Sequence, residues 1–122
     1  VYKRQGGKHM RVVKKGTDYC IKLSDEPAID GLRPCANVMY ESLENCQYDE
    51  ITCVVLTGMG ADGTKGIQGL AAHHKKLHVI AQDADTCVVY GMPKAIAQTG
   101  LVDEVVPLGS VAETITKNVG VS

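Results

Sequence analysis

The chain of 122 residues has the length of one domain, and its 44% hydrophobic and 22% charged residues are a composition typical of a folded globular protein. Thirteen Lys and Arg residues against 14 Asp and Glu residues give a formal net charge of −1, which excludes an overall basic surface for nucleic acid. The apolar runs fall far short of the roughly 20 residues of a membrane helix, so we expect a cytoplasmic protein without membrane insertion. Five cysteines without a CxxC pair indicate reduced, structural thiols.

The first third of the chain is predicted to form strands, a loop and a helix. Two β-prone stretches, residues 10–15 and 19–24, flank a Gly-containing turn and predict a β-hairpin. Pro27 and an Asp-Gly pair then indicate a loop. Apolar residues recur at helical spacing after Pro34, so a helix is expected over residues 34–45, with Pro34 at its first position.

The remainder of the chain alternates between strands and helices. The apolar, β-branched residues 51–57 predict a strand that is buried on both faces of a parallel sheet. The later elements are expected at residues 63–75 (helix), 77–82 (strand), 93–99 (helix), 104–107 (strand) and from about 110 (helix). This alternation predicts βαβ units in an α/β fold, with a doubly wound, mainly parallel sheet and helices on both faces.

The most informative motif is TGMGADG at residues 57–63, between the predicted buried strand and a helix. Its glycines have the GxGxxG spacing of a Rossmann-type dinucleotide-binding module, and Asp83 follows about 20 residues later, where such a module has an acidic residue. However, Asp62 would place a carboxylate where the amides of the helix N-terminus bind pyrophosphate. Dinucleotide binding therefore stays an alternative hypothesis.

A second interpretation of the same turn makes use of Asp62. Catalytic groups gather at the carboxyl ends of parallel strands, and a carboxylate held there by helix amides stays ionised. In a serine hydrolase such a carboxylate holds a histidine in the correct tautomer and stabilises the imidazolium. The simpler interpretation is that Asp62 only caps the helix that follows it.

Several segments together resemble the C-terminal part of the catalytic domain of the chemotaxis protein-glutamate methylesterases, the CheB family. They are GGKHM (6–10), GLRPCANVMYESL (31–43), TGMGADG (57–63), AQDADTCVVYGMPKAI (81–96) and GLVDEVVPL (100–108). The combination of TGMG.DG with CVV.GMP is specific to this family. Cys35 and Asn37 stand where the family usually has Ser and Asp.

The resemblance implies an enzyme that hydrolyses methyl esters of receptor glutamates, and deamidates receptor glutamines, through a Ser-His-Asp triad. The triad aspartate falls on Asp62, and Met59 of the same turn is linked to the oxyanion hole through its backbone amide. The family motifs that carry the serine and the histidine are not in this chain, so we expect the chain alone to be inactive. His74 and His78 have the spacing of a metal pair but lack a clear third ligand, and neither a metal nor a cofactor is expected.

The resemblance also divides the chain and implies its partners. Residues 6–122 correspond to the C-terminal part of the catalytic domain, with the N-terminal part and the receiver domain absent. Residues 1–5, VYKRQ, depart from the family pattern and resemble a translated sequencing adapter, so we expect them to be non-native. Methyl-accepting chemotaxis receptors are implied as substrate, and the receiver domain as a partner in the full-length protein. Without the missing strands, the chain is expected to be marginally stable and to self-associate.

Overall fold

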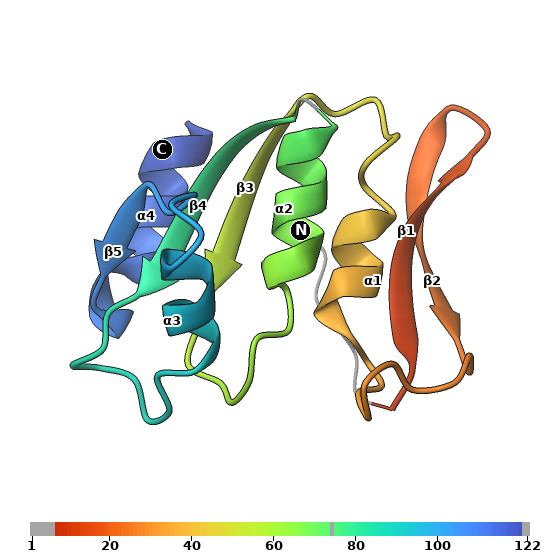
Figure 1. The fold of residues 1–122 in the computed structure, drawn as a ribbon. Coiled ribbons are helices and arrows are strands. Elements are labelled where there is room, and N and C mark those ends of the chain that lie inside the picture. Colours follow the sequence, from red (N-terminus) through yellow and green to blue (C-terminus); the bar gives the residue numbers. More distant parts are fainter. Residues whose placement is uncertain (1–6, 74, 121–122) are drawn as a thin grey trace.

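The elements of the computed structural model follow the predicted order, and the structure describes residues 7–73 and 75–120 (Figure 1). The predictions for residues 1–5 and for His74 lie outside the described residues. The strands are β1 (His9–Lys15), β2 (Asp18–Ser24), β3 (Glu50–Val55), β4 (Lys76–Gln82) and β5 (Glu104–Val106). The helices are α1 (Ala36–Glu41), α2 (Thr64–Ala72), α3 (Met92–Ala97) and α4 (Val111–Val119), with a 3-10 turn (Leu108–Ser110) before α4.

The last three strands form a parallel sheet in the order β3-β4-β5, in which Cys53 is opposite Val79. Helices α2 and α3 lie on one face of this sheet and α4 lies on the other (Figure 1). The predicted α/β fold with a parallel sheet and a separate hairpin is therefore confirmed. Among the described residues β3 pairs with β4 only, so its second edge carries no strand there.

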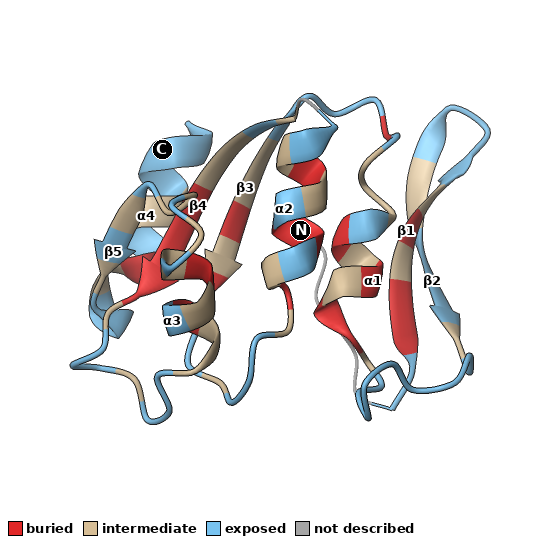
Figure 2. Cartoon of the chain, in the orientation of Figure 1, coloured by how far each residue is buried: buried red, intermediate tan, exposed pale blue. Residues whose placement is uncertain are grey.

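The core of the sheet lies on the side of α2 and α3, as the buried segments of these elements in Figure 2 indicate. Side chains that alternate along two strands meet apolar side chains of the helices in this core: Cys53, Val55, Val79, Ala81, Ile67, Leu70 and Ile96. On the opposite face Thr52 accepts a hydrogen bond from Asn118 of α4. Because Thr52 and Val54 are only half-buried, the prediction that this strand is buried on both faces is confirmed for one face.

The hairpin β1–β2 forms as predicted, with antiparallel pairing that places Val12 opposite Ile21. Helix α1 packs against β1 on one side and against α2 on the other, and thus joins the hairpin to the sheet (Figure 1). Ser42 fastens the end of α1 to the hairpin, because its Oγ accepts a hydrogen bond from Val12 N at 2.9 Å and donates one to Met39 O. The hairpin therefore supports the end of the helix.

Helix α1 is shorter than the predicted helix over residues 34–45. It begins at Ala36 and ends at Glu41, so the placement of Pro34 at the first helical position is wrong. The backbone amide of Ala36 bonds to a side chain 26 residues further along the chain, and no local signal could reveal this capping partner. Beyond Glu41 the chain continues in turns with i→i+3 hydrogen bonds, and these preserve the apolar spacing without an α-helix.

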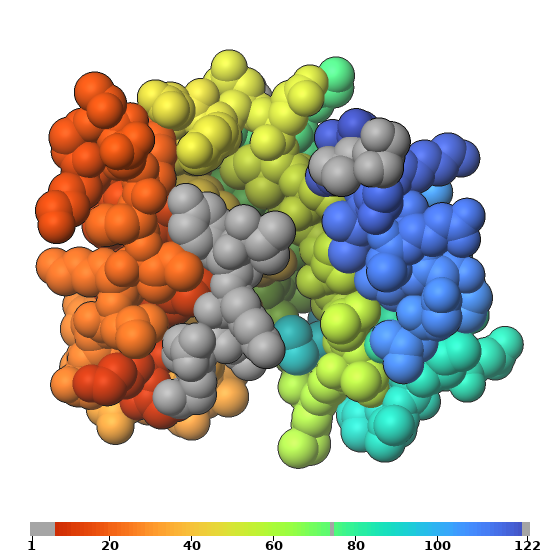
Figure 3. Space-filling model, turned by 180° about the vertical axis from the view of Figure 1, so that it is seen from behind, coloured from red at the N-terminus to blue at the C-terminus, as the bar shows by residue number. Residues whose placement is uncertain are grey.

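The reverse side of the molecule has α4 over the sheet at one side and the hairpin at the other (Figure 3). Helix α4 contacts β3 and β4 and ends at Val119, and the next residue, Gly120, has a φ of 74°, the left-handed conformation that glycine readily adopts at a helix C-terminus. None of the described helices combines the length and the apolar character needed to cross a membrane.

Candidate functional site

The loops that follow β3 and β4 run side by side at the carboxyl end of the sheet. Gly58 N donates to Val89 O at 3.0 Å, and Gly58 O accepts from Gly91 N at 3.1 Å and from Met92 N at 2.8 Å. Thr57 Oγ1 accepts from Val89 N at 2.9 Å and donates to Val89 O at 3.1 Å. The two motifs that carry the resemblance, TGMGADG and the segment around CVVYGMP, therefore form one structural unit.

The side chain of Gln82, the last residue of β4, makes hydrogen bonds to both loops. Its side chain is buried, with 1% exposed, and its Oε1 accepts from Thr57 N at 2.8 Å. Its Nε2 donates to the backbone oxygen of Thr86 at 2.8 Å. One amide side chain thus satisfies a donor of the first loop and an acceptor of the second, beyond the last residue pair of β3 and β4.

Gly91 allows the loops to approach this closely. A Cβ at this position would lie 2.6 Å from Gly58 O, 2.9 Å from Gly60 N and 3.2 Å from the Cα of Met59. All three contacts are with backbone, which cannot move aside as a flexible side chain can. The turn around Met59 is therefore packed against Gly91.

The side chain of Met59 is 84% exposed, at the tip of the first loop, while the backbone on both sides of it is fixed by the contacts described above. Val88 of the neighbouring loop is 91% exposed. The carboxyl edge of the sheet thus presents two apolar side chains to solvent, each next to a residue, Gly58 or Val89, whose backbone is hydrogen-bonded.

Asp62 lies in the same turn, and its carboxylate accepts hydrogen bonds at the beginning of α1. Oδ2 accepts from Ala36 N at 2.7 Å, and Oδ1 accepts from Asn37 N at 3.2 Å and from the thiol of Cys35 at 3.2 Å. Helix amides hold this carboxylate as predicted, but they belong to α1 and not to the helix that follows Asp62. The simpler interpretation named the wrong helix, because the N-cap residue of α2 is Gly63 and the helix that Asp62 caps is α1.

Asn37 makes the converse contact. Its Oδ1 accepts from Gly63 N at 3.0 Å and from Gly66 N at 2.8 Å, which are amides at the beginning of α2. Each helix thus has unpaired N-terminal amides capped by a side chain from the start of the other. Sequence reasoning noted Asn37 only as a departure from the family pattern, because its partners lie 26 and 29 residues away.

Cys35 completes the surroundings of the carboxylate, and its side chain is buried. Burial, and then the hydrogen bond to Asp62, raise the pKa of this thiol above its ordinary value, so it is a protonated donor at neutral pH and no nucleophile. Cys35 N donates to His9 Nδ1 at 3.3 Å, and the other ring nitrogen of His9 donates to Pro27 O at 2.9 Å. Both ring nitrogens of His9 are thus engaged by backbone groups.

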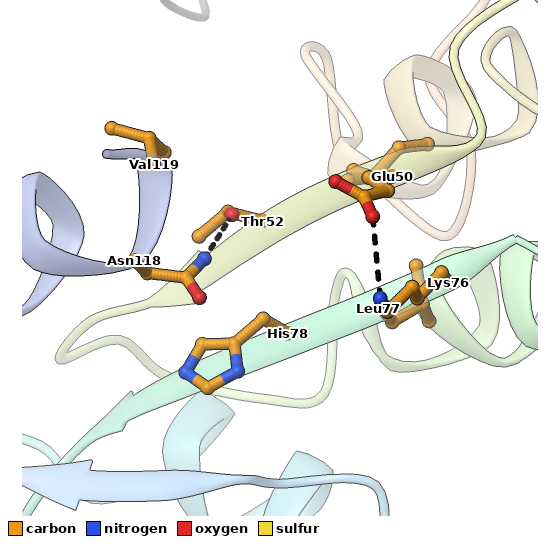
Figure 4. A pocket seen from close by; sticks show the side chains of 8 residues that line it. Glu50, Thr52, Lys76, Leu77, His78, Asn118 and Val119 are labelled. Carbon is orange, nitrogen blue, oxygen red and sulfur yellow. Dashed lines mark hydrogen bonds and ion pairs between the residues drawn. The ribbon is translucent and has the colours of Figure 1, made fainter. Parts of the chain in front are cut away.

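A cavity of about 430 Å³ lies at the opposite end of the sheet, where β3 and β4 begin (Figure 4). Its lining comes from these two strands and from α4: Glu50, Ile51, Thr52, Lys76, Leu77, His78, Asn118 and Val119. His78 pairs with Glu104 at 2.6 Å, and Lys76 pairs with Glu50 at 3.3 Å. This cavity is separate from the candidate site, which lies at the carboxyl ends of the strands, where ligands of parallel sheets bind.

Within residues 7–73 and 75–120, no three potential metal ligands converge.

The site does not favour the dinucleotide alternative. A pyrophosphate would need the amides at the start of α2, and the amides of Gly63 and Gly66 are bonded to Asn37. Asp83, the acidic residue that the dinucleotide hypothesis uses, is hydrogen-bonded within its own loop, where its Oδ1 accepts from Thr86 N at 3.0 Å. Both groups that would bind the dinucleotide are thus used within the fold.

Fold and site together define an α/β protein with a parallel sheet, in which a carboxylate is fixed in the loop at the carboxyl end of a strand. The model of the CheB methylesterase family matches residues 1–115, and the chain belongs to this family.

Similar proteins include the protein-glutamate methylesterase/protein-glutamine glutaminase of Desulfotalea psychrophila, which is 42% identical over 120 residues, 97% of this chain and 32% of that protein. The protein of the same name from Lawsonia intracellularis is 44% identical over 110 residues, 90% of this chain and 30% of that protein. The crystal structure of the Thermotoga maritima CheB methylesterase catalytic domain is similar with a TM-score of 0.82 and 30% identity, over 92% of this chain and 58% of that domain. The chain spans about a third of the length of these curated relatives.

Proposed function

We propose that the complete protein hydrolyses methyl esters of glutamate side chains on chemotaxis receptors and deamidates receptor glutamines, in the cytoplasm. The names of the relatives as protein-glutamate methylesterase/protein-glutamine glutaminase support this function. The single observation that carries the proposal is the Asp62 carboxylate, which stands at the carboxyl end of a parallel strand and is held by two backbone amides of α1.

In the proposed mechanism Asp62 is the carboxylate of a Ser-His-Asp triad. It keeps the histidine in the tautomer that can take the serine proton, and it stabilises the imidazolium that forms. The serine attacks the ester carbonyl and methanol leaves, after which water releases glutamate from the acyl-enzyme. The serine and histidine belong to a part of the enzyme outside these 122 residues, and a receiver domain is the proposed partner in the full-length protein.

Met59 is proposed to contribute its backbone amide to the oxyanion hole. The close packing of its backbone against Gly91, together with the hydrogen bonds of Gly58, supports this role, since a donor for a developing oxyanion must be fixed before the reaction. The exposed Met59 side chain is proposed to contact the receptor surface.

The test is methanol release from methylated receptor, measured for the complete enzyme and for the 122-residue chain. The complete enzyme is expected to be active, and the chain is expected to be inactive, because loss of the nucleophile and base costs on the order of a million-fold in rate. Turnover by the chain that Asp62→Ala abolishes would contradict the assignment of the serine and histidine to another part of the enzyme.

A further inference from the structure

The junction between α1 and α2 contains two polar side chains that cap each other's helices. The Asp62 carboxylate accepts from the amides of Ala36 and Asn37, and the Asn37 side chain accepts from the amides of Gly63 and Gly66. Asp62 directly precedes Gly63. The two contacts therefore close a short ring, in which Asn37 N binds Asp62 Oδ1 at 3.2 Å and Asn37 Oδ1 binds the next amide, Gly63 N, at 3.0 Å.

A ring of this size limits the side-chain torsions of Asp62. The carboxylate is fixed from the side of α1, and the backbone that carries it is fixed by the Asn37 oxygen. Since both partners of Asn37 Oδ1 are N–H donors, only an acceptor at this position can make the contact. Loss of the Asn37 oxygen would leave Asp62 with its amide partners but free the start of α2 to move.

The two helices also lie close enough for this contact only because residue 66 is glycine. A Cβ on Gly66 would lie 2.6 Å from the Cβ of Tyr40 and 3.1 Å from the Cα of Asn37. The backbone of α2 therefore approaches the α1 position that carries the Asn37 side chain. The close packing of the two helices and the capping contacts of Asp62 and Asn37 therefore act together on the first turn of α2.

We propose that Asn37 is a positioning residue for Asp62, an inference that rests on the proposed function of Asp62 as the triad carboxylate. Asn37 fixes the first turn of α2, and with it the orientation in which Asp62 meets the histidine. Because both partners of Asn37 Oδ1 are N–H donors, acceptance of the two amides is the property that matters.

The experiment compares Asn37→Ala, Asn37→Asp and the matched control Asn118→Ala in the complete enzyme, with kcat and KM for methanol release. Asn118 lies on α4 and bonds to Thr52, away from the candidate site. We expect Asn37→Ala to lower kcat about 10- to 100-fold with little change in KM, as misplacement of a catalytic group does. Asn37→Asp is expected to restore most of kcat, and Asn118→Ala to leave it unchanged.

Amide hydrogen exchange in the complete enzyme provides the second measurement. In Asn37→Ala the amides of Gly63 and Gly66 are expected to exchange faster than in the unsubstituted enzyme, and in Asn37→Asp they are expected to stay protected. A kcat within about twofold of the unsubstituted enzyme in Asn37→Ala, or no recovery in Asn37→Asp, overturns the positioning role. Absence of hydrolysis by the unsubstituted complete enzyme overturns instead the proposed function itself.

Discussion

Gln82 and Thr57 are joined by a hydrogen bond of 2.8 Å between the buried Oε1 of the glutamine and the backbone N–H of the threonine. The contact ties the end of β4 to the first residues of the loop that carries Met59 and Asp62. The glutamine also binds the backbone of the next loop at Thr86. The geometry of the candidate site thus depends on a side chain that lies beneath it and has no part in the proposed chemistry.

Substitution of this glutamine by a residue of similar volume is expected to destabilise the fold. Gln82→Met leaves the N–H of Thr57 and the carbonyl of Thr86 without their partner, at a cost of about 1–3 kcal/mol in the free energy of unfolding. The matched control is Gln68→Met, at an exposed position of α2, for which a change within about 0.5 kcal/mol is expected. Urea unfolding measures both, and equal effects would contradict the structural role of Gln82.

Gly91→Ala is expected to displace the turn around Met59. The added Cβ would lie 2.6 Å from Gly58 O and 2.9 Å from Gly60 N, so the backbone must shift, at a cost of about 1–3 kcal/mol. Gly109→Ala is the control, since a Cβ there meets no atom within 4 Å. NMR shifts of Met59 and Gly60 that respond equally to both substitutions would contradict this packing.

Stability is expected to fall at alkaline pH because of a buried thiol. Burial raises the pKa of Cys53 from an ordinary 9.0 to about 12. Between these values the unfolded chain loses the thiol proton and the folded chain keeps it, so the free energy of unfolding falls as pH rises, by up to about 1.4 kcal/mol per pH unit. Below pH 9 the contribution is fully present.

The measurement is urea unfolding between pH 7 and about pH 11, for the unsubstituted chain and for Cys53→Ala. The alanine variant starts from a lower stability because of the lost packing, and its stability is expected to decline less steeply above pH 9. The same slope in both proteins would show that this thiol does not contribute to the pH dependence.

The alternation of elements after residue 50 could be predicted because each strand and helix there has its own hydrophobic period. The hairpin was predictable for the same reason, from two β-prone stretches around Gly16. The bounds of α1 could not be predicted, because its cap comes from Asp62, 26 residues after Ala36. Local signals place a helix start only when the capping residue is local.

The candidate site, like the fold, has a part that could be predicted from the sequence and a part that could not. Asp62 and Met59 lie in a motif that is contiguous in sequence, so the resemblance to the family could identify them as candidate site residues. The polar residues that hold this motif are dispersed: Asn37 lies 25 residues before Asp62, and Gln82 lies 25 residues after Thr57. A polar residue at the end of the apolar strand 77–82 is the one signal that could have indicated Gln82. Nothing in the sequence pairs Asn37 with α2.

The most direct test of the proposed catalytic role is kcat for methanol release by the complete enzyme with Asp62→Asn. The amide is expected to permit the wrong histidine tautomer and to lower kcat by up to about four orders of magnitude, with the far-ultraviolet circular dichroism unchanged. Near-normal turnover by a folded Asp62→Asn enzyme would contradict this account and would leave Asp62 with the capping of α1 as its function.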